Sequence, residues 1–360
     1  MGSLTVIPRR FWFAALLVSA SASAQAPLSD ENAYNPIPSP DGQKIVAVRT
    51  GWGREGGSGG SGRSNLRSDL IVLDRTGRTL SPLLQADHFV ADWNRGGIVS
   101  FRDWSYSLLA EDGRIRDQGR VCPIDLIRDP INGCGERVAY LPTLRSFVWV
   151  HRKFGDSVLM TAHGELSPHH HDEFLGEWLA PSPNERYLAV GPGRFGRSLN
   201  VYDLREKTWT GLGAAVIHPA DWWYWMEPSW SAWFADSSQI AFFTAEGLIV
   251  SSPDGKRKRV VLRTGEPAGL AVPSPDGRAI AYGTFASRPR TSGGGNIPIW
   301  SCTGIWVVGT DGSRRPQRLV GPTMSLTYDL RWLDNGHLVF DRIEEGQPPR
   351  ARLWTVAAGH

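Results

Sequence analysis

Two distant stretches of the chain, VPSPDGRAIAY at residues 272–282 and IPSPDGQKIVAV at residues 37–48, share one pattern. In each of them a Ser-Pro-Asp-Gly turn is followed by a short, almost continuous apolar run. Proline presets φ at the first turn position, aspartate can bond to its own backbone, and glycine takes the position with positive φ. The apolar run is typical of a strand that is covered on both faces. The pattern therefore predicts a turn that leads into a buried strand.

The same sequence of a turn and a short apolar strand occurs seven times along the chain. The copies are residues 38–48, 92–101, 129–141, 181–190, 234–243, 273–282 and 332–340, and those from 92 and 129 are degenerate. A second unit with alternating strands follows each copy, at residues 69–83, 106–121, 146–160, 199–212, 247–262, 304–320 and 351–360. Repeats of about 40–50 residues with four strands each are typical of β-propellers.

We therefore predict an all-β fold, a closed β-propeller of seven four-stranded blades. A six-bladed ring, with one weak unit absorbed into loops, is the alternative. The last unit, residues 351–360, holds a single strand. The seventh blade would then lack its outer strand, which residues 27–34 could supply and so close the ring.

The N-terminus has the three parts of a secretory signal peptide. Arg9 and Arg10 form a basic region, the apolar run FWFAALLV is too short to span a bilayer, and small residues surround Ala24-Gln25-Ala26. We expect residues 1–26 to be removed and residues 27–360 to form a single propeller domain. The mature protein would be periplasmic or extracellular and would keep no integral membrane segment.

Composition and charge are consistent with a turn-rich protein of near-neutral charge. The chain contains 40 Gly, 25 Pro and 16 Trp, which indicates many turns and much aromatic packing. The formal net charge is +3, and both signal-peptide arginines contribute to it, which leaves +1 for the mature chain. This balance does not favour nucleic acid as a partner.

Three cysteines would lie in an oxidising compartment. Cys122 and Cys134 are close in sequence and could bridge two neighbouring strands, so we predict a disulfide between them. Cys302 is not part of this predicted disulfide. No activating partner lies near it in sequence, so it is not a favoured nucleophile.

The repeat resembles that of TolB-type, or WD-repeat-like, propellers. The resemblance rests on Ser-Pro-Asp-Gly followed by an IAF- or IAY-type strand and then by a strand that ends in Asp-x-x-Gly. It is strong at residues 38–48 and 273–282 and covers essentially the whole mature chain. It implies a periplasmic or secreted protein, and many such proteins are binding or scaffolding modules. TolB itself has six blades and an additional N-terminal α/β domain, so its role and partners are not carried over.

The connections of a four-stranded blade alternate between the two faces of the ring. The turns between strands one and two and between strands three and four share one face, and the remaining connections share the other. Long or unusual insertions fall in the second set, at residues 51–67, 162–178, 191–197, 213–228 and 285–302. Long loops on a rigid scaffold commonly carry function. Three of these five flank blade 4, so we place the candidate site there.

A histidine run in one of these loops could bind a transition metal. Imidazole and carboxylate ligands are available from the segment His169-His170-His171-Asp172-Glu173, and His163 and His218 could add ligands. The tentative metal set is His169, His171 and His218. The favoured alternative is a solvated polar loop, because the spacing is not that of a zinc motif.

Aromatic and basic side chains in the neighbouring loops could bind an organic ligand. Tryptophan offers flat faces for stacking on sugars or aromatic side chains, and arginine can hold a carboxylate with two hydrogen bonds. The candidate ligand-binding residues are Trp222, Trp223, Trp225, Arg194, Arg197 and Asp221. Packing between blades for the tryptophans, and ordinary surface charge for the arginines, are the alternatives.

Two functions are compatible with these residues. The favoured one is a secreted or periplasmic binding or scaffolding protein that presents its loop-rich face to a protein, peptide or glycan and needs no cofactor. The alternative is a metal-assisted polysaccharide lyase or other carbohydrate-active enzyme that resembles oligogalacturonate lyases. Those propellers act on acidic sugars with histidines and a metal, and the alternative would need one divalent metal. The sequence contains no recognisable catalytic set, so no catalytic residue is assigned.

Overall fold

The computed structural model describes residues 25–29, 32–52, 66–85, 89–102, 105–120, 134–153, 156–168, 175–192, 198–215, 233–288, 299–321, 329–344 and 350–359. These residues form strands β1 to β27, arranged in seven separate antiparallel sheets.

Blades 1 to 4 each contain four strands in sequential order. Blade 1 consists of β2 (Ala33–Pro38), β3 (Lys44–Trp52), β4 (Leu66–Asp74) and β5 (Thr79–Gln85). Blade 2 consists of β6 (Phe89–Asn94), β7 (Gly97–Arg102), β8 (Ser105–Leu109) and β9 (Ile115–Arg120). Blade 3 consists of β10 (Cys134–Leu141), β11 (Ser146–Lys153), β12 (Asp156–Thr161) and β13 (Gly164–Glu165). Blade 4 consists of β14 (Leu175–Pro181), β15 (Tyr187–Pro192), β16 (Ser198–Asp203) and β17 (Thr208–Ala214).

Blades 5 to 7 complete the ring. Blade 5 contains β18 (Ile240–Thr244), β19 (Gly247–Ser251) and β20 (Lys258–Leu262), and Trp233 bridges to Ile240 at the position of its inner strand. Blade 6 consists of β21 (Ala268–Pro273), β22 (Ala279–Arg288), β23 (Ile299–Gly309) and β24 (Gln317–Val320). Blade 7 consists of β25 (Leu330–Asp334), β26 (His337–Glu344), β27 (Arg350–Ala357) and β1 (Gln25–Pro27).

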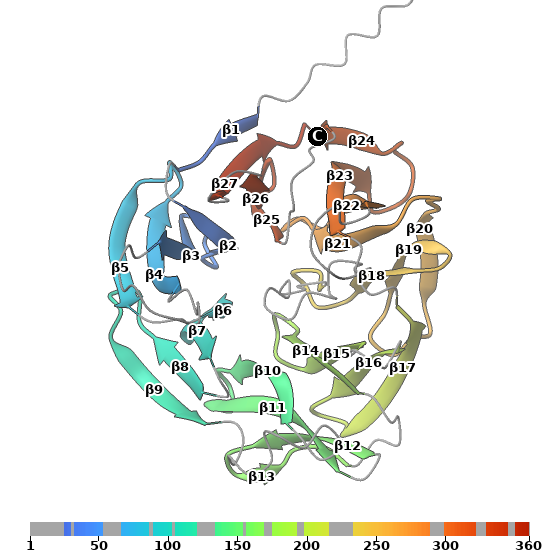
Figure 1. Ribbon diagram of the computed structural model, residues 1–360. Helices are drawn as coiled ribbons and strands as arrows, with labels where there is room; N and C mark the ends of the chain where they lie inside the picture. Colours follow the sequence, from blue (N-terminus) through green and yellow to red (C-terminus); the bar gives the residue numbers. More distant parts are fainter. Residues whose placement is uncertain are drawn as a thin grey trace, which may run out of the picture.

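The blades are arranged around a centre, with the first strand of each blade innermost and the last one at the periphery (Figure 1). Seven clusters of buried apolar side chains lie in the described residues, and each is formed mainly by two consecutive blades. A blade therefore buries both faces of its sheet only against its neighbours, which is why the ring must close. The prediction of a seven-bladed propeller is confirmed, and the six-bladed alternative is wrong.

The Ser-Pro-Asp-Gly turn has the predicted geometry, and its serine adds two hydrogen bonds. In blade 1 the Ser39 hydroxyl donates to Asp41 Oδ1 at 2.6 Å and accepts the Lys44 backbone N–H at 2.9 Å. Gly42 takes the positive φ, at 66°. The same pair of serine bonds is found in three further turns, which begin at Ser182, Ser252 and Ser274.

Two blades use a tryptophan instead of proline where the inner strand ends. Trp233 Nε1 donates to Ala180 O at 2.9 Å, and Trp332 Nε1 donates to Val272 O at 2.8 Å. Each acceptor lies in the inner strand of the preceding blade, β14 or β21. These indole groups therefore join consecutive blades near the centre of the ring, since each N–H is buried and needs a partner.

An N-terminal strand does supply the outer strand of blade 7, but it lies earlier in the chain than residues 27–34. The closing strand is β1, in which Gln25, Ala26 and Pro27 pair with Val356, Thr355 and Trp354 of β27. The residues that follow lead to the inner strand of blade 1, which already begins at Ala33. Too few residues remain after position 27 to form both the closing strand and this connection.

Candidate functional site

The predicted site around blade 4 lies outside the described residues. This holds for the candidate ligands Arg194, Arg197, Asp221, Trp222, Trp223 and Trp225, for the metal candidates His169, His171 and His218, and for Cys122. Cys134 begins β10, and only its backbone is described. The ligand set, the metal set and the disulfide therefore stay predictions.

His163 is described, and it lies in the turn between the third and fourth strands of blade 3, β12 and β13. Within the described ranges, no group of three or more His, Cys, Asp or Glu side chains could hold a metal ion. No helix in those ranges is long and apolar enough to cross a membrane.

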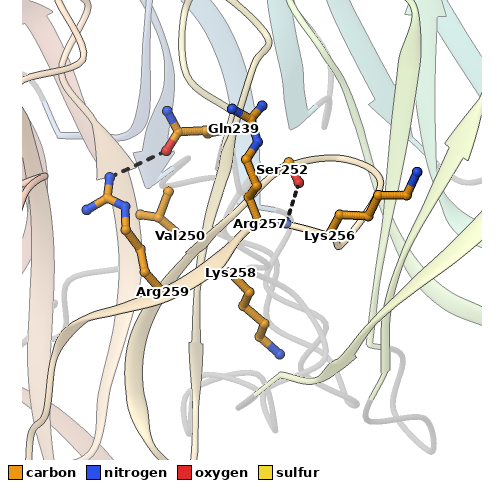
Figure 2. A pocket seen from close by; sticks show the side chains of 7 residues that line it. All are labelled: Gln239, Val250, Ser252, Lys256, Arg257, Lys258 and Arg259. Carbon is orange, nitrogen blue, oxygen red and sulfur yellow. Dashed lines mark hydrogen bonds between the residues drawn. The ribbon is translucent and has the colours of Figure 1, made fainter.

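A pocket of about 460 Å³ lies along the outer strand of blade 5 (Figure 2). We call it the blade 5 basic pocket. Four of its residues are consecutive cations, and the full lining is Gln239, Val250, Ser252, Lys256, Arg257, Lys258 and Arg259. In Figure 2 the Lys258 side chain points away from those of the other three cations. The pocket is on the side of the ring that carries the short turns, because Ser252 and Gln239 belong to such turns.

A Ser-Pro-Asp-Gly turn fixes the start of this basic run. Ser252 Oγ donates to Asp254 Oδ1 at 2.5 Å and accepts the Arg257 backbone N–H at 3.0 Å. The Ser252 hydrogen bond is the main cause that lowers the pKa of Asp254, followed by the Lys256 backbone N–H. The carboxylate is therefore ionised beside the cations. It offsets only one of their four charges.

Two of the four cations are held by neighbouring blades. Lys258 Nζ donates to Leu212 O of blade 4 at 3.0 Å, and it lies 5.7 Å from the centroid of the Phe242 ring. Arg259 donates to Thr310 O of blade 6 and, at 3.4 Å, to Gln239 Oε1. These bonds position the backbone of β20 firmly between blades 4 and 6.

The other two cations remain available to a ligand. Lys256 Nζ lies 4.0 Å from Asp254 Oδ2, and its side chain is 83 % exposed, so this ion pair is weak. The Arg257 side chain makes no hydrogen bond or ion pair with the described residues, and Arg257 is exposed. Two further exposed arginines, Arg314 and Arg315, follow the blade 6 turn that packs against β20. The pocket therefore has an excess of positive charge that suits an anionic ligand.

A second polar cluster lies near the inner ends of blades 7 and 1, and its groups are occupied by the protein itself. Asp341 accepts the Asn35 backbone N–H at 3.1 Å through Oδ2 and the Asp329 backbone N–H at 3.0 Å through Oδ1. Arg331 pairs with Asp329 at 3.2 Å and donates to Leu330 O at 3.1 Å. All three charged residues are buried. This cluster joins two blades and leaves little capacity for a ligand.

Asp92 on β6 faces the same cluster from blade 2. Burial raises the pKa of its carboxyl, whereas the Asn94 amide, which donates to Oδ2 at 2.9 Å, and the charge of Arg331 act to lower it. A raised pKa alone does not define a catalytic group. The other acids of the cluster are already engaged, since Asp341 accepts two backbone N–H groups and Asp329 pairs with Arg331, so the basic pocket is the better candidate site.

The basic pocket was not predicted from the sequence, although the cationic run that forms it is visible there. The run Lys256-Arg257-Lys258-Arg259 is the densest cationic stretch of the chain. The net charge of the whole chain, +3, does not reveal this run, because acidic residues elsewhere offset its charge. The contacts to Leu212 and Thr310 join residues 46 and 51 positions apart, so no local pattern reveals them.

Comparison with solved structures gives similarity at the level of the fold. The β-propeller domain of Cps50 (Swd1) from Myceliophteria thermophila has a TM-score of 0.51 and 12% identity, over 90% of this chain and 99% of that one. An oligogalacturonate lyase in complex with manganese has a TM-score of 0.38 and 14% identity, over 59% of this chain. The match spans 62% of the lyase chain.

No family model matches the sequence, and no curated protein matches it either. The resemblance to TolB-type repeats therefore rests on the repeat residues alone.

Proposed function

We propose that this chain is a binding or scaffolding protein whose blade 5 basic pocket holds an extended acidic segment of a partner protein. The observation that carries the proposal is the row of four cations, of which Lys258 and Arg259 are bonded to neighbouring blades, whereas Lys256 and Arg257 have no such bond among the described residues. The two bonded cations fix the strand, and the other two can bond to carboxylates without first breaking strong bonds. Such pre-organisation lowers the cost of binding.

The position of the cations on an outer strand favours an extended peptide. Among the described residues, strand β20 pairs with β19 alone, so its other edge can accept an added strand through backbone hydrogen bonds. Lys256 and Arg257 lie directly before Lys258, the first residue of β20, so they can bond to acidic side chains at the start of such an added strand. Charge on an edge strand also hinders pairing with uncharged strands, which makes the site selective.

The proposed setting is the periplasm or the extracellular space, in line with the N-terminal pattern of a basic region, an apolar run and small residues. The long loops on the opposite face, which include the tryptophan and histidine candidates, stay a second predicted surface for a protein, peptide or glycan. A ring with two such surfaces could hold two partners at once, which is the scaffolding role.

The experiment measures binding of a short fluorescent peptide with glutamate at alternate positions, by anisotropy, to the wild type and to Lys256→Ala/Arg257→Ala. Each exposed ion pair contributes about 0.2–1 kcal/mol, so losing two weakens binding by about two- to thirtyfold. Added salt weakens binding to the wild type, because exposed charges are screened.

The matched control is Arg114→Ala/Arg120→Ala, which removes two exposed arginines from blade 2 and changes the net charge equally. We expect the control to bind the peptide like the wild type. Equal weakening in both variants would mean that net charge alone attracts the peptide, and the proposal would fail. Tighter binding of a polyuronate than of the peptide, lost in the same blade 5 variant, would replace the peptide by an acidic glycan.

A further inference from the structure

The strand that closes the ring begins at Gln25, next to the expected signal-peptide cleavage site. All three residues of β1 pair with β27, and the Leu28 backbone N–H continues the ladder to Leu353 O at 2.8 Å. Figure 1 shows β1 beside β27 at the outer edge of blade 7. Residues 25–28 are therefore part of the folded ring.

The side chains of this segment are also integrated into the ring. Gln25 Oε1 accepts a hydrogen bond from Arg342 Nη2 at 3.0 Å, and the Arg342 guanidinium stacks over the Trp354 ring, 4.5 Å from its centroid. Leu28 is buried in the cluster between blades 7 and 1. Its carbonyl oxygen lies 1.6 Å from where a Cβ on Gly77 would be, so only glycine fits there.

Three Ala-x-Ala triplets satisfy the small-residue rule of signal peptides. Cleavage after Ala26 follows the triplet Ala24-Gln25-Ala26, cleavage after Ala24 follows Ala22-Ser23-Ala24, and cleavage after Ala22 follows Ala20-Ser21-Ala22. The first position would remove two of the three residues of β1 and the Gln25–Arg342 bond. It would also place Pro27, which has no backbone N–H and a fixed φ, directly after the cleaved bond. The second and third positions both keep the whole strand, and the second lies directly before its first residue.

We propose that a signal peptidase hydrolyses the Ala24–Gln25 bond, so that the mature ring begins at Gln25. Water adds across the peptide bond, leaving a carboxylate on Ala24 and an amine on Gln25. The proposed boundary lies two residues before the expected one at residue 26. It depends on secretion through a signal peptide and is independent of the acidic ligand at blade 5.

The test is to express the full chain in a bacterial host and to determine the N-terminus of the exported protein by intact mass and N-terminal peptide sequencing. We expect a start at Gln25, as the free amine or as pyroglutamate. A start at Pro27, or a chain that keeps its N-terminal segment, would overturn the proposal.

Two matched variants distinguish the cleavage positions. Ala24→Leu places a large side chain in the triplets of both bonds, so we expect the start at Gln25 to be lost, and it serves as the control for blocked processing. Ala26→Leu places the same side chain before the other bond, and since Ala26 is exposed in β1, the ring should tolerate it. We expect normal processing of Ala26→Leu. Blocked processing of Ala26→Leu would refute the assignment.

A second measurement keeps the inference testable if export is poor. Purified chains that begin at Gln25 and at Pro27 are compared by thermal unfolding. We expect a higher midpoint for the chain that begins at Gln25, because it keeps the β1–β27 pairing and the bond to Arg342. Equal midpoints would show that residues 25 and 26 do not contribute to ring closure.

Discussion

The same turn, Ser-Pro-Asp-Gly, occurs at residues 39–42 in blade 1 and at residues 252–255 in blade 5, with the same internal hydrogen bonds but different neighbours. In blade 1 it joins the two inner strands and packs against blade 7, where a Cβ on Gly42 would lie 2.1 Å from Leu333 O. In blade 5 it joins the two outer strands, and a Cβ on Gly255 would meet side-chain carbons at 3.5 Å and the Gly211 oxygen at 3.9 Å, which are ordinary contacts. Local hydrogen bonds define the turn, and its neighbours decide how closely it is packed.

The largest effect is expected from Gly42→Ala. The new Cβ collides with a backbone oxygen, and alanine is also strained at a φ of 66°. Strain at positive φ and overpacking together should lower the free energy of unfolding by about 3 kcal/mol, measured by urea denaturation. The control is Gly255→Ala, where only the strain applies and about 1 kcal/mol is expected. An equal loss of unfolding free energy in the two variants would show that the closer packing of the blade 1 turn has no effect on stability.

Replacing the turn serines should separate stability from binding. Ser39→Ala and Ser252→Ala each remove a hydrogen bond to a backbone N–H, and we expect each to cost about 1–2 kcal/mol of stability. Only Ser252→Ala should also weaken binding of the acidic peptide, because Ser252 fixes the backbone at Arg257. Thermal unfolding and peptide anisotropy on both variants test this. Weaker binding in Ser39→Ala would show that general loosening of the ring is the cause.

A smaller effect of opposite sign is expected for the turn carboxylates. Asp254→Asn keeps an acceptor for Ser252 but removes the negative charge beside Lys256, so peptide binding should become about two- to threefold tighter. Asp41→Asn makes the same change in blade 1 and should leave the affinity unchanged. A titration of the peptide against both variants gives the ratio. Tighter peptide binding in both variants would show that the net charge of the protein, and not the charge beside Lys256, sets the affinity.

The fold was predictable from sequence because its main determinants are local. The Ser-Pro-Asp-Gly turn acts within six residues, and the strand pattern repeats around the ring. The hydrogen bonds of the turn serine and the bounds of β1 were not predicted from the sequence. Pairing of Gln25 with Val356 spans the whole chain, and nothing in the segment 25–28 has a strong strand pattern.

The candidate site was less predictable than the fold. Unusual residue types drew attention to loops that lie outside the described residues. The basic run was visible, but its value as a site depends on which cations are already bonded. That depends on Leu212 and Thr310, which belong to other blades.

The smallest effect is expected on the pH dependence of stability. It concerns the turn Asp74-Arg75-Thr76-Gly77 in blade 1, which lacks the serine of the Ser-Pro-Asp-Gly turns. The Thr76 hydroxyl, ahead of the backbone N–H groups of Arg78 and Thr76, lowers the pKa of Asp74 to about 2 from an ordinary value of 3.8. A carboxyl with a lowered folded-state pKa stabilises the fold above the unfolded pKa. Its contribution is lost as the pH falls from about 4 to about 2.

Asp74→Asn should therefore flatten the dependence of stability on pH between about 4 and about 2. Urea denaturation at several pH values in this range gives the slope for both proteins. Identical slopes would mean that the Thr76 hydrogen bond does not persist in solution.

The pairing of β1 with β27 also has a consequence for how the chain can be rearranged. Gln25 and Val356 are register partners, so the two ends of the folded ring are neighbours. A short linker could join residue 359 to residue 25, and new ends could be opened between two other blades. Each core cluster depends mainly on two consecutive blades, so such a circular permutant would keep every interface. The cyclic order of the blades, and not the residue with which translation starts, determines this structure.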